Sequence, residues 1–111
     1  MQVIEWDDFT KVELRVGTII RAEINNKARN PAYVMDVDLG ELGIKRSSAQ
    51  ITVHYTPEDL IDKRILCVCN FEVKRIAGIK SEVLITGAPD ETGAIVLAEF
   101  NLPVPNGSRL A

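Results

Sequence analysis

The sequence is poor in the side chains that build metal centres. It holds one histidine and two cysteines among 111 residues. Cys67 and Cys69 lie two residues apart in an apolar run, so on a strand their side chains point to the same face and suit small buried positions. One C-x-C pair with a single histidine cannot complete a tetrahedral zinc site. We therefore expect no metal, no disulfide, and a reducing, cytoplasmic compartment.

Motifs for catalysis and for cofactor binding are also missing. No serine or cysteine sits in a nucleophile-elbow pattern, and neither a G-x-x-x-x-G-K-[ST] loop nor a G-x-G-x-x-G run occurs. His54 is the only imidazole, and a lone general base needs a positioned partner in a cleft. We expect His54 to lie on the surface or on an edge strand. This inventory predicts a binding protein that is not an enzyme and takes no cofactor.

Long apolar segments are lacking as well. No apolar run approaches about 18 residues, the length of a membrane span. The segment from Met1 to Asp8 has neither the basic nor the apolar stretch of a signal peptide. We therefore expect no membrane insertion. The mass of 12.3 kDa, with 46% hydrophobic and 26% charged residues, predicts one globular domain over residues 1–111.

The hydrophobic pattern that is present has a period of two, which is typical of β-strands. A long strand is predicted over residues 14–24, with its even-numbered residues as the apolar face and Gly17 as a bulge or bend. A second strand over 33–39 alternates cleanly, so one of its faces is predicted to be buried. Further strands are predicted over 45–53, 64–71, 82–86 and 94–99.

One short helix is predicted over residues 57–61. Thr56 is a suitable N-cap, Pro57 suits the first helical position, and two acidic residues suit the first turn. A single helical turn capped by an aspartate is predicted over 7–12. A helix between the third and fourth strands is the arrangement of an OB-fold, a five-stranded Greek-key barrel. We therefore expect an all-β OB-fold with N- and C-terminal extensions; a β-sandwich is the alternative.

The net charge of −3 is unevenly distributed. The two ends are acidic, whereas residues 21–80 hold ten basic and eight acidic side chains. A local basic patch results if the barrel gathers three basic groups on one face; the alternative is that they are solvated loop ends. These groups are Lys27 with Arg29, Lys45 with Arg46, and Lys74 and Arg75 with Lys80. Among six aromatic residues, the candidates for base stacking are Tyr33, Tyr55 and Phe71, although each also suits a core or a dimer surface.

Three segments resemble the motifs of the tRNA-binding domain family. Residues 8–19, with Arg15-Val16-Gly17, resemble its opening motif, residues 28–40 its second, and residues 70–81 its N…R-x-I-x-G-x-x-S motif. That family includes the C-terminal domain of bacterial methionyl-tRNA synthetases. Segments 31–33, 45–52, 81–84 and 104–110 are similar to its CsaA subfamily, so the resemblance covers about residues 7–110.

The resemblance implies an OB-fold homodimer with one of three roles. The first is chaperone-like binding of unfolded or presecretory polypeptides in bacterial protein export. The second is binding of tRNA or another structured RNA. The third is that of an accessory domain that docks on a synthetase. For RNA, the motif positions imply these contacts to phosphates, backbone or bases: Asn70, Lys74, Arg75, Lys80 and Ser81. Glu82 departs from the family pattern, and its carboxylate is expected to repel RNA.

Two further sets of residues follow from these roles. For polypeptides, we expect an exposed apolar groove, because methionine and aromatic side chains adapt to varied sequences. Its expected lining is Tyr33, Met35, Ile79 and Val83, with a core position as the alternative for Met35. The apolar flanks exceed what a barrel needs and predict a two-fold interface between two copies of the chain. Its expected residues are Phe9, Phe100, Leu102, Val104 and Leu110.

Overall fold

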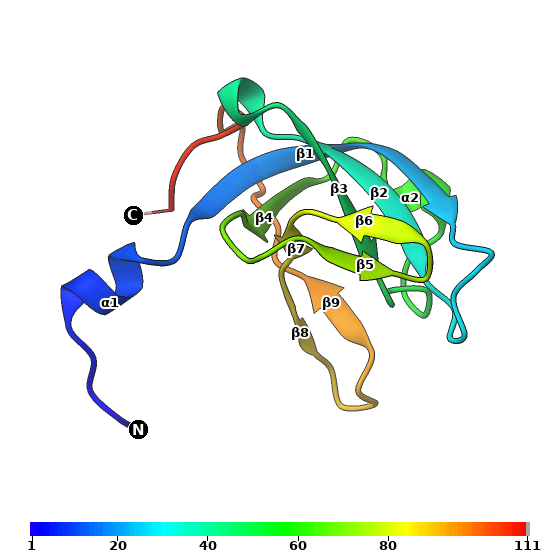
Figure 1. Ribbon diagram of the computed structural model, residues 1–111, viewed down its shortest axis with the longest axis horizontal. Helices are drawn as coiled ribbons and strands as arrows, with labels where there is room; N and C mark the ends of the chain where they lie inside the picture. The colour runs from blue at the N-terminus through cyan, green and yellow to red at the C-terminus, as the bar shows by residue number, and fades with distance from the viewer. Residues whose placement is uncertain (111) are drawn as a thin grey trace.

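The fold is built on an antiparallel sheet that curls into a nearly closed barrel, as the computed structural model in Figure 1 shows. The structure describes residues 1–110. Five strands lie in the order β3-β2-β1-β4-β7. Their bounds are β1 Leu14–Ile24, β2 Tyr33–Asp38, β3 Ile44–Ala49, β4 Arg64–Val68 and β7 Leu84–Ile85. The helix α2 (Pro57–Leu60) lies between β3 and β4 in the chain, which confirms the predicted OB-like fold class.

Smaller elements surround this sheet. Two short hairpins pair β5 (Lys74–Ile76) with β6 (Ile79–Ser81) and β8 (Gly87–Pro89) with β9 (Ile95–Leu97). The helix α1 (Trp6–Thr10) stands off the barrel near the N-terminus, and the 3-10 turn η1 (Gly40–Leu42) joins β2 to β3. Among residues 1–110, no helix is long and apolar enough to span a membrane.

The strand β1 is bulged, but not at Gly17. Its register with β2 slips between Ile19 and Arg21, so Ile20 has no partner. Gly17 and Ile19 are buried before the bulge, whereas Ile20 and Ile24 are exposed. The predicted core face of even-numbered residues is therefore wrong before the bulge, where Gly17 and Ile19 face the core; after it the even-numbered Ala22 packs against the core, because one extra residue shifts the side-chain alternation.

Gly17 instead lies where β1 packs closely against the end of β2. A Cβ at this position meets Val37 Cγ1 at 2.5 Å and Leu39 Cδ2 at 2.8 Å. Both neighbours belong to the core. Glycine is therefore required here for close approach rather than for a bend.

The core lies inside the barrel. The predicted alternation of β2 is confirmed, since Tyr33, Met35 and Val37 are buried and the residues between them are half-buried. Burial among apolar neighbours raises the pKa of the Cys67 thiol to about 12. Further core residues come from β1, β4, β7, β9 and the ends of η1 and α2, among them Ile19, Leu39, Leu60, Ile65, Ile85 and Leu97.

The predicted helix starts and strand ends differ locally from those observed. The cap of α2 is confirmed, because Thr56 Oγ1 accepts a hydrogen bond from the Asp59 amide at 3.2 Å. The helix α1 begins at Trp6, one residue earlier than predicted, and Asp8 caps it from within by accepting a bond from the Glu5 amide. The third and fourth strands end at Ala49 and Val68, short of their predicted limits.

Candidate binding site

The β5–β6 hairpin presents several of the predicted RNA contacts. Its register pairs Lys74 with Ser81 and Arg75 with Lys80. Directly opposed residues share a face of a hairpin, so the Arg75 and Lys80 side chains leave one face, and Lys74 leaves the other with Ile76. The turn between the strands has two consecutive residues with positive φ, Ala77 at 47° and Gly78 at 80°. This is the geometry of a tight two-residue hairpin turn.

Four cations on and beside this hairpin form what we call the basic strip: Lys27, Lys74, Arg75 and Lys80. All four are exposed, and none lies within 4 Å of a carboxylate in residues 1–110. Lys27 comes from the β1–β2 loop, and its Cδ lies 3.0 Å from the position of a Cβ on Gly78. Like charges directly opposed across a hairpin repel one another, so the strip gains from an anionic partner.

The two basic residues of β3, Lys45 and Arg46, have carboxylate neighbours, unlike those of the basic strip. Arg46 Nε lies 3.0 Å from Asp36 Oδ1, and Lys45 Nζ lies 3.9 Å from Glu82 Oε2. The sequence suggested that this pair adds to one patch with the hairpin cations. The structure gives both β3 cations carboxylate neighbours, whereas the basic strip and the exposed Arg29 have none within 4 Å among residues 1–110.

Glu82 is turned toward the edge of β3. Its carboxylate accepts a hydrogen bond from the Arg46 amide at 3.2 Å, and its own amide donates to the Arg46 carbonyl at 2.7 Å. These bonds join the segment before β7 to β3 and help to close the barrel. The carboxylate that the sequence placed against RNA is thus held by a backbone amide and faced by Lys45.

Asn70 and Ser81 make bonds within the chain. The Asn70 side chain accepts from the Glu13 amide at 2.9 Å and donates to the Lys11 carbonyl at 2.7 Å. It therefore clamps the segment before β1 to the end of β4. The Ser81 hydroxyl lies 3.4 Å from the Ser48 amide, which donates to it. The structure thus gathers three of the five predicted contacts, Lys74, Arg75 and Lys80, as free side chains.

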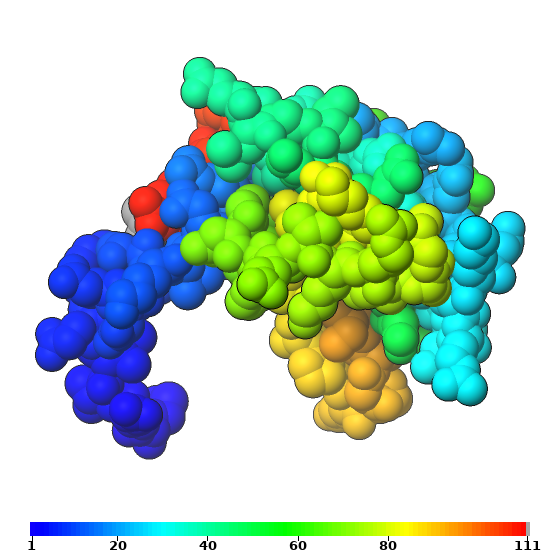
Figure 2. Space-filling view, viewed as in Figure 1, coloured from blue at the N-terminus to red at the C-terminus, as the bar shows by residue number. Residues whose placement is uncertain are grey.

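An apolar groove opens beside the basic strip. Its volume is about 450 Å³, and its apolar walls are Phe71, Ile76, Val83 and Leu84. The exposed fractions are 58% for Phe71, 49% for Leu84 and 43% for Ile76, whereas Val83 is buried at its floor. Figure 2 shows the segment around residues 70–81, in green to yellow, on the face turned to the viewer. The polar lining is Ser48, Glu72, Lys74, Ser81 and Glu82.

The predicted groove lining is only partly at the surface. Met35 has no exposed surface, and Tyr33 is 7% exposed with its hydroxyl donating to the Tyr55 carbonyl at 2.7 Å. Their prediction as lining of an exposed groove is wrong, because both belong to the core. Ile79 is half-buried and lines a neighbouring hollow, so Val83 is the one predicted residue in the groove. Ile76 and Leu84 were not predicted as groove lining, and Phe71 was predicted only as a base-stacking, core or dimer-surface residue.

The two flanks of the chain lie side by side. The Gly107 amide donates to the Val16 carbonyl at 2.7 Å, and the Leu110 amide donates to the Leu14 carbonyl at 2.9 Å. The C-terminal segment therefore runs along the start of β1, close to the root of α1 (Figure 1). Leu102 is 69% exposed. The other predicted flank residues are half-buried: Phe9, Phe100, Val104 and Leu110.

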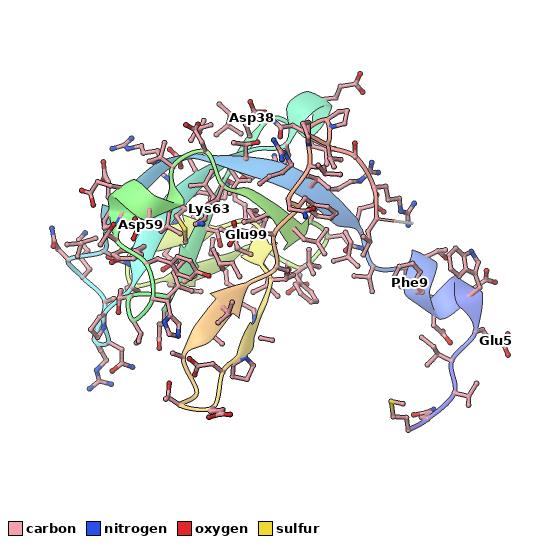
Figure 3. The ribbon with its side chains drawn as sticks, turned by 180° about the vertical axis from the view of Figure 1, so that it is seen from behind. Glu5, Phe9, Asp38, Asp59, Lys63 and Glu99 are labelled. Atoms are coloured by element: carbon pink, nitrogen blue, oxygen red, sulfur yellow. The ribbon has the colours of Figure 1, made fainter. Side chains whose placement is uncertain are left out.

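His54 has a partner on the β8–β9 hairpin. Its Nε2 lies 2.6 Å from Asp90 Oδ2. The hydroxyl of Thr92 and this contact with His54 lower the pKa of Asp90 to about 2. Lys63 and Glu99, labelled in Figure 3, form a second link to the C-terminal segment at 3.2 Å.

Comparison with known proteins gives one consistent result. The family described as "Putative tRNA binding domain" matches residues 14–109. The crystal structure of chaperone CsaA from Bacillus anthracis str. Ames is 47% identical, with a TM-score of 0.92, and the match covers 99% of this chain and 100% of that one. CsaA chaperone protein from Picrophilus torridus is 38% identical, with a TM-score of 0.90, over 98% of this chain and 100% of that one.

A longer relative shares the same region. The methionine–tRNA ligase of Methanococcus aeolicus is 38% identical over 104 residues. These residues are 94% of this chain but 15% of the ligase. The chain thus spans a small part of the curated ligases that it matches, and the whole length of the CsaA structures.

Proposed function

Because the chain belongs to the tRNA-binding domain family, we propose that it is a CsaA-like protein that binds unfolded or presecretory polypeptides in bacterial protein export. The observation that carries this proposal is the apolar groove. Its walls combine an aromatic ring with aliphatic side chains that are already exposed to water, so binding an apolar segment removes apolar surface on both partners. Apolar walls make no directional demand on a bound side chain and so suit many sequences, as a chaperone requires.

We also propose that the protein is a homodimer. The chain exposes 7444 Å², about 1,300 Å² more than the roughly 6,100 Å² expected for a folded monomer of this mass. A stable interface of ordinary size takes about 800 Å² from each partner. The exposed side chain of Leu102 and the half-buried flank residues beside it supply apolar surface for such an interface. A two-fold dimer carries two apolar grooves and two basic strips.

The basic strip favours a second function, binding of tRNA or another structured RNA. Three of its members, Lys74, Arg75 and Lys80, come from the hairpin that matches the family motif and have no carboxylate partner among residues 1–110. Exposed cations without acidic neighbours can neutralise phosphates and release counterions. Glu82 weakens this function less than the sequence suggested, because Lys45 faces its carboxylate.

One paired titration separates the two functions. A labelled tRNA and a labelled unfolded polypeptide are titrated at about 50 and 200 mM salt, the range over which phosphate contacts lose affinity steeply. Three proteins are compared: the natural chain, Arg75→Ala/Lys80→Ala in the part of the basic strip outside the groove, and Lys11→Ala/Arg21→Ala as a control with the same loss of charge. We expect polypeptide binding in all three at both salt concentrations. We expect tRNA affinity to fall steeply from the lower to the higher salt concentration, with a salt slope smaller by about 2 in the strip variant alone.

The outcomes have distinct meanings. If the protein at stoichiometric concentration neither binds the polypeptide nor suppresses its aggregation, the chaperone proposal is wrong. If tRNA does not bind at about 50 mM salt, the RNA function is excluded. Equal losses in the two charge variants assign RNA binding to overall charge rather than to the basic strip.

A further inference from the structure

The first ten residues form an arm that stands off the barrel. We call residues 1–10 the N-terminal arm; they include α1 and the extended residues before it. Val3 is 93% exposed, Trp6 66% and Ile4 61%. Figure 3 shows Glu5 and Phe9 on this arm, apart from the rest of the molecule. Apolar side chains gathered at this level of exposure mark a surface that another body covers.

The arm is also acidic, and this matches the surroundings of the apolar groove. Glu5, Asp7 and Asp8 lie among its apolar residues, and no basic residue occurs before Lys11. On the barrel, the apolar groove borders the basic strip, and Lys74 belongs to both. Glu72 also lines the groove, whereas Glu82 is held by the Arg46 amide and faced by Lys45. An apolar and acidic peptide therefore fits an apolar groove beside unpaired cations.

The root of the arm is fixed so that the arm leaves its own barrel. Asn70 holds the Lys11 carbonyl and the Glu13 amide, and the next residue, Phe71, is a wall of the groove. From this clamp α1 extends outward and away from the β5–β6 hairpin of the same chain (Figure 1). The five residues before α1 reach about 17 Å when extended, enough to contact a neighbouring copy well away from the root of the arm.

We propose that the N-terminal arm of one copy occupies the apolar groove of a second copy, with Trp6 against Phe71 and Leu84. The arm is then an internal peptide that an unfolded client must displace, and it keeps the grooves covered when no client is present. The claim that a client displaces the arm rests on the polypeptide binding proposed above. The claim that the arm docks in the groove does not rest on it, because docking is a contact between two copies in the absence of any client.

Trp6 is the only tryptophan, so its fluorescence reports on the arm alone. We expect the emission maximum of the dimer at a shorter wavelength than that of the unfolded chain. The maximum should move to longer wavelength in Phe71→Ser and in Leu84→Ser. The control is Val96→Ser, on the β8–β9 hairpin outside the groove lining. Circular dichroism and light scattering verify that each variant folds and dimerises. A solvent-like emission in a folded dimer, or one that neither groove variant alters, overturns the proposal.

A mixing experiment tests whether docking occurs between copies. One chain keeps Trp6 and carries Phe71→Ser/Leu84→Ser; the other carries Trp6→Phe and an intact groove. Docking between copies predicts that mixing shifts the emission back to shorter wavelength, because Trp6 now meets an intact groove on its partner. An unchanged emission after subunit exchange overturns docking between copies.

Client binding separates this proposal from the proposed function. If the arm fills nine grooves in ten, Trp6→Ser raises the apparent affinity for an unfolded polypeptide about tenfold. If clients bind, but Trp6→Ser leaves their affinity unchanged and the groove variants leave the Trp6 emission unchanged, the arm proposal is wrong and the chaperone function stands. If no client binds any variant, the chaperone function is wrong, and the Trp6 emission still decides whether the arm docks.

Discussion

At the scale of single residues, packing inside the barrel sets positions that the hydrophobic pattern leaves open. Gly17 is the clearest case, since β1 approaches Val37 and Leu39 too closely there for any side chain. The core around this contact includes Met35 and Ile19, which are fully buried. Such a close approach is a property of the assembled barrel.

We predict that Gly17→Ala lowers the free energy of unfolding by about 1–3 kcal/mol, because the new methyl group overpacks the core. Urea unfolding of the variant measures the loss. The double variant Gly17→Ala/Val37→Ala makes room for the methyl group and should lose less than the sum of the two single variants. Strictly additive losses, or an unchanged midpoint for Gly17→Ala, contradict the packing derived for this site.

The candidate site residues show what a pattern can and cannot predict. The alternation along β2 correctly placed Tyr33, Met35 and Val37 on one face. It could not show whether that face lines a surface groove or the barrel interior, because both are apolar on the same period. The basic strip was foreseeable for the opposite reason, since its hairpin cations lie within one short segment and matched a family motif.

At the scale of elements, the three-residue strands β5, β6 and β8 escaped prediction, whereas β7 and β9 lie within the strands predicted over 82–86 and 94–99. A strand of three residues holds too little sequence for a period of two to appear. The hairpin turn between β5 and β6 also lacks the usual Asn-Gly signal, because Ala77 takes the first left-handed position. Ile76 lies on the missed strand β5, and Leu84 lies on a predicted strand whose pattern did not mark it as groove lining, so two groove walls were missed while the five-strand barrel was found.

The β8–β9 hairpin is an element whose stability should depend on pH. Asp90 Oδ1 accepts from the Thr92 amide at 2.8 Å and from its hydroxyl at 2.7 Å, and Oδ2 faces His54. These bonds favour the carboxylate and lower the pKa of Asp90 to about 2, from 3.8 in the unfolded chain. The stabilisation is therefore complete above about pH 4 and is lost as the pH falls to about 2.

We predict that Asp90→Asn lowers the melting temperature at neutral pH and that its difference from the natural chain shrinks between about pH 4 and pH 2. Thermal unfolding followed by circular dichroism across this range measures the difference. Asp7→Asn, on the exposed arm, is the control and should show no such trend. A difference for Asp90→Asn that stays constant down to pH 2 contradicts the role assigned to its carboxylate.

At the scale of the whole molecule, charge and apolar surface are segregated. The acidic arm leaves one side of the barrel, while the basic strip and the apolar groove lie together on the β5–β6 hairpin and its surroundings. The net charge of −3 is a sum over the whole chain and therefore does not give the local charge of either surface. The segregation accounts for both proposed ligands, since an apolar polypeptide and an RNA phosphate use adjoining surfaces with different dependence on salt.

The central claim is that the apolar groove binds polypeptide, and one affinity measurement tests it most directly. Fluorescence anisotropy of a labelled unfolded polypeptide is recorded with the natural chain, Leu84→Asp and Val96→Asp. The two substituted leucine and valine side chains are matched, since they are 49% and 46% exposed and both lie on short strands. A carboxylate in the groove must be desolvated by an apolar client, so we predict at least a tenfold loss of affinity, roughly 1.4 kcal/mol, for Leu84→Asp alone. Equal affinities for all three proteins would contradict the account.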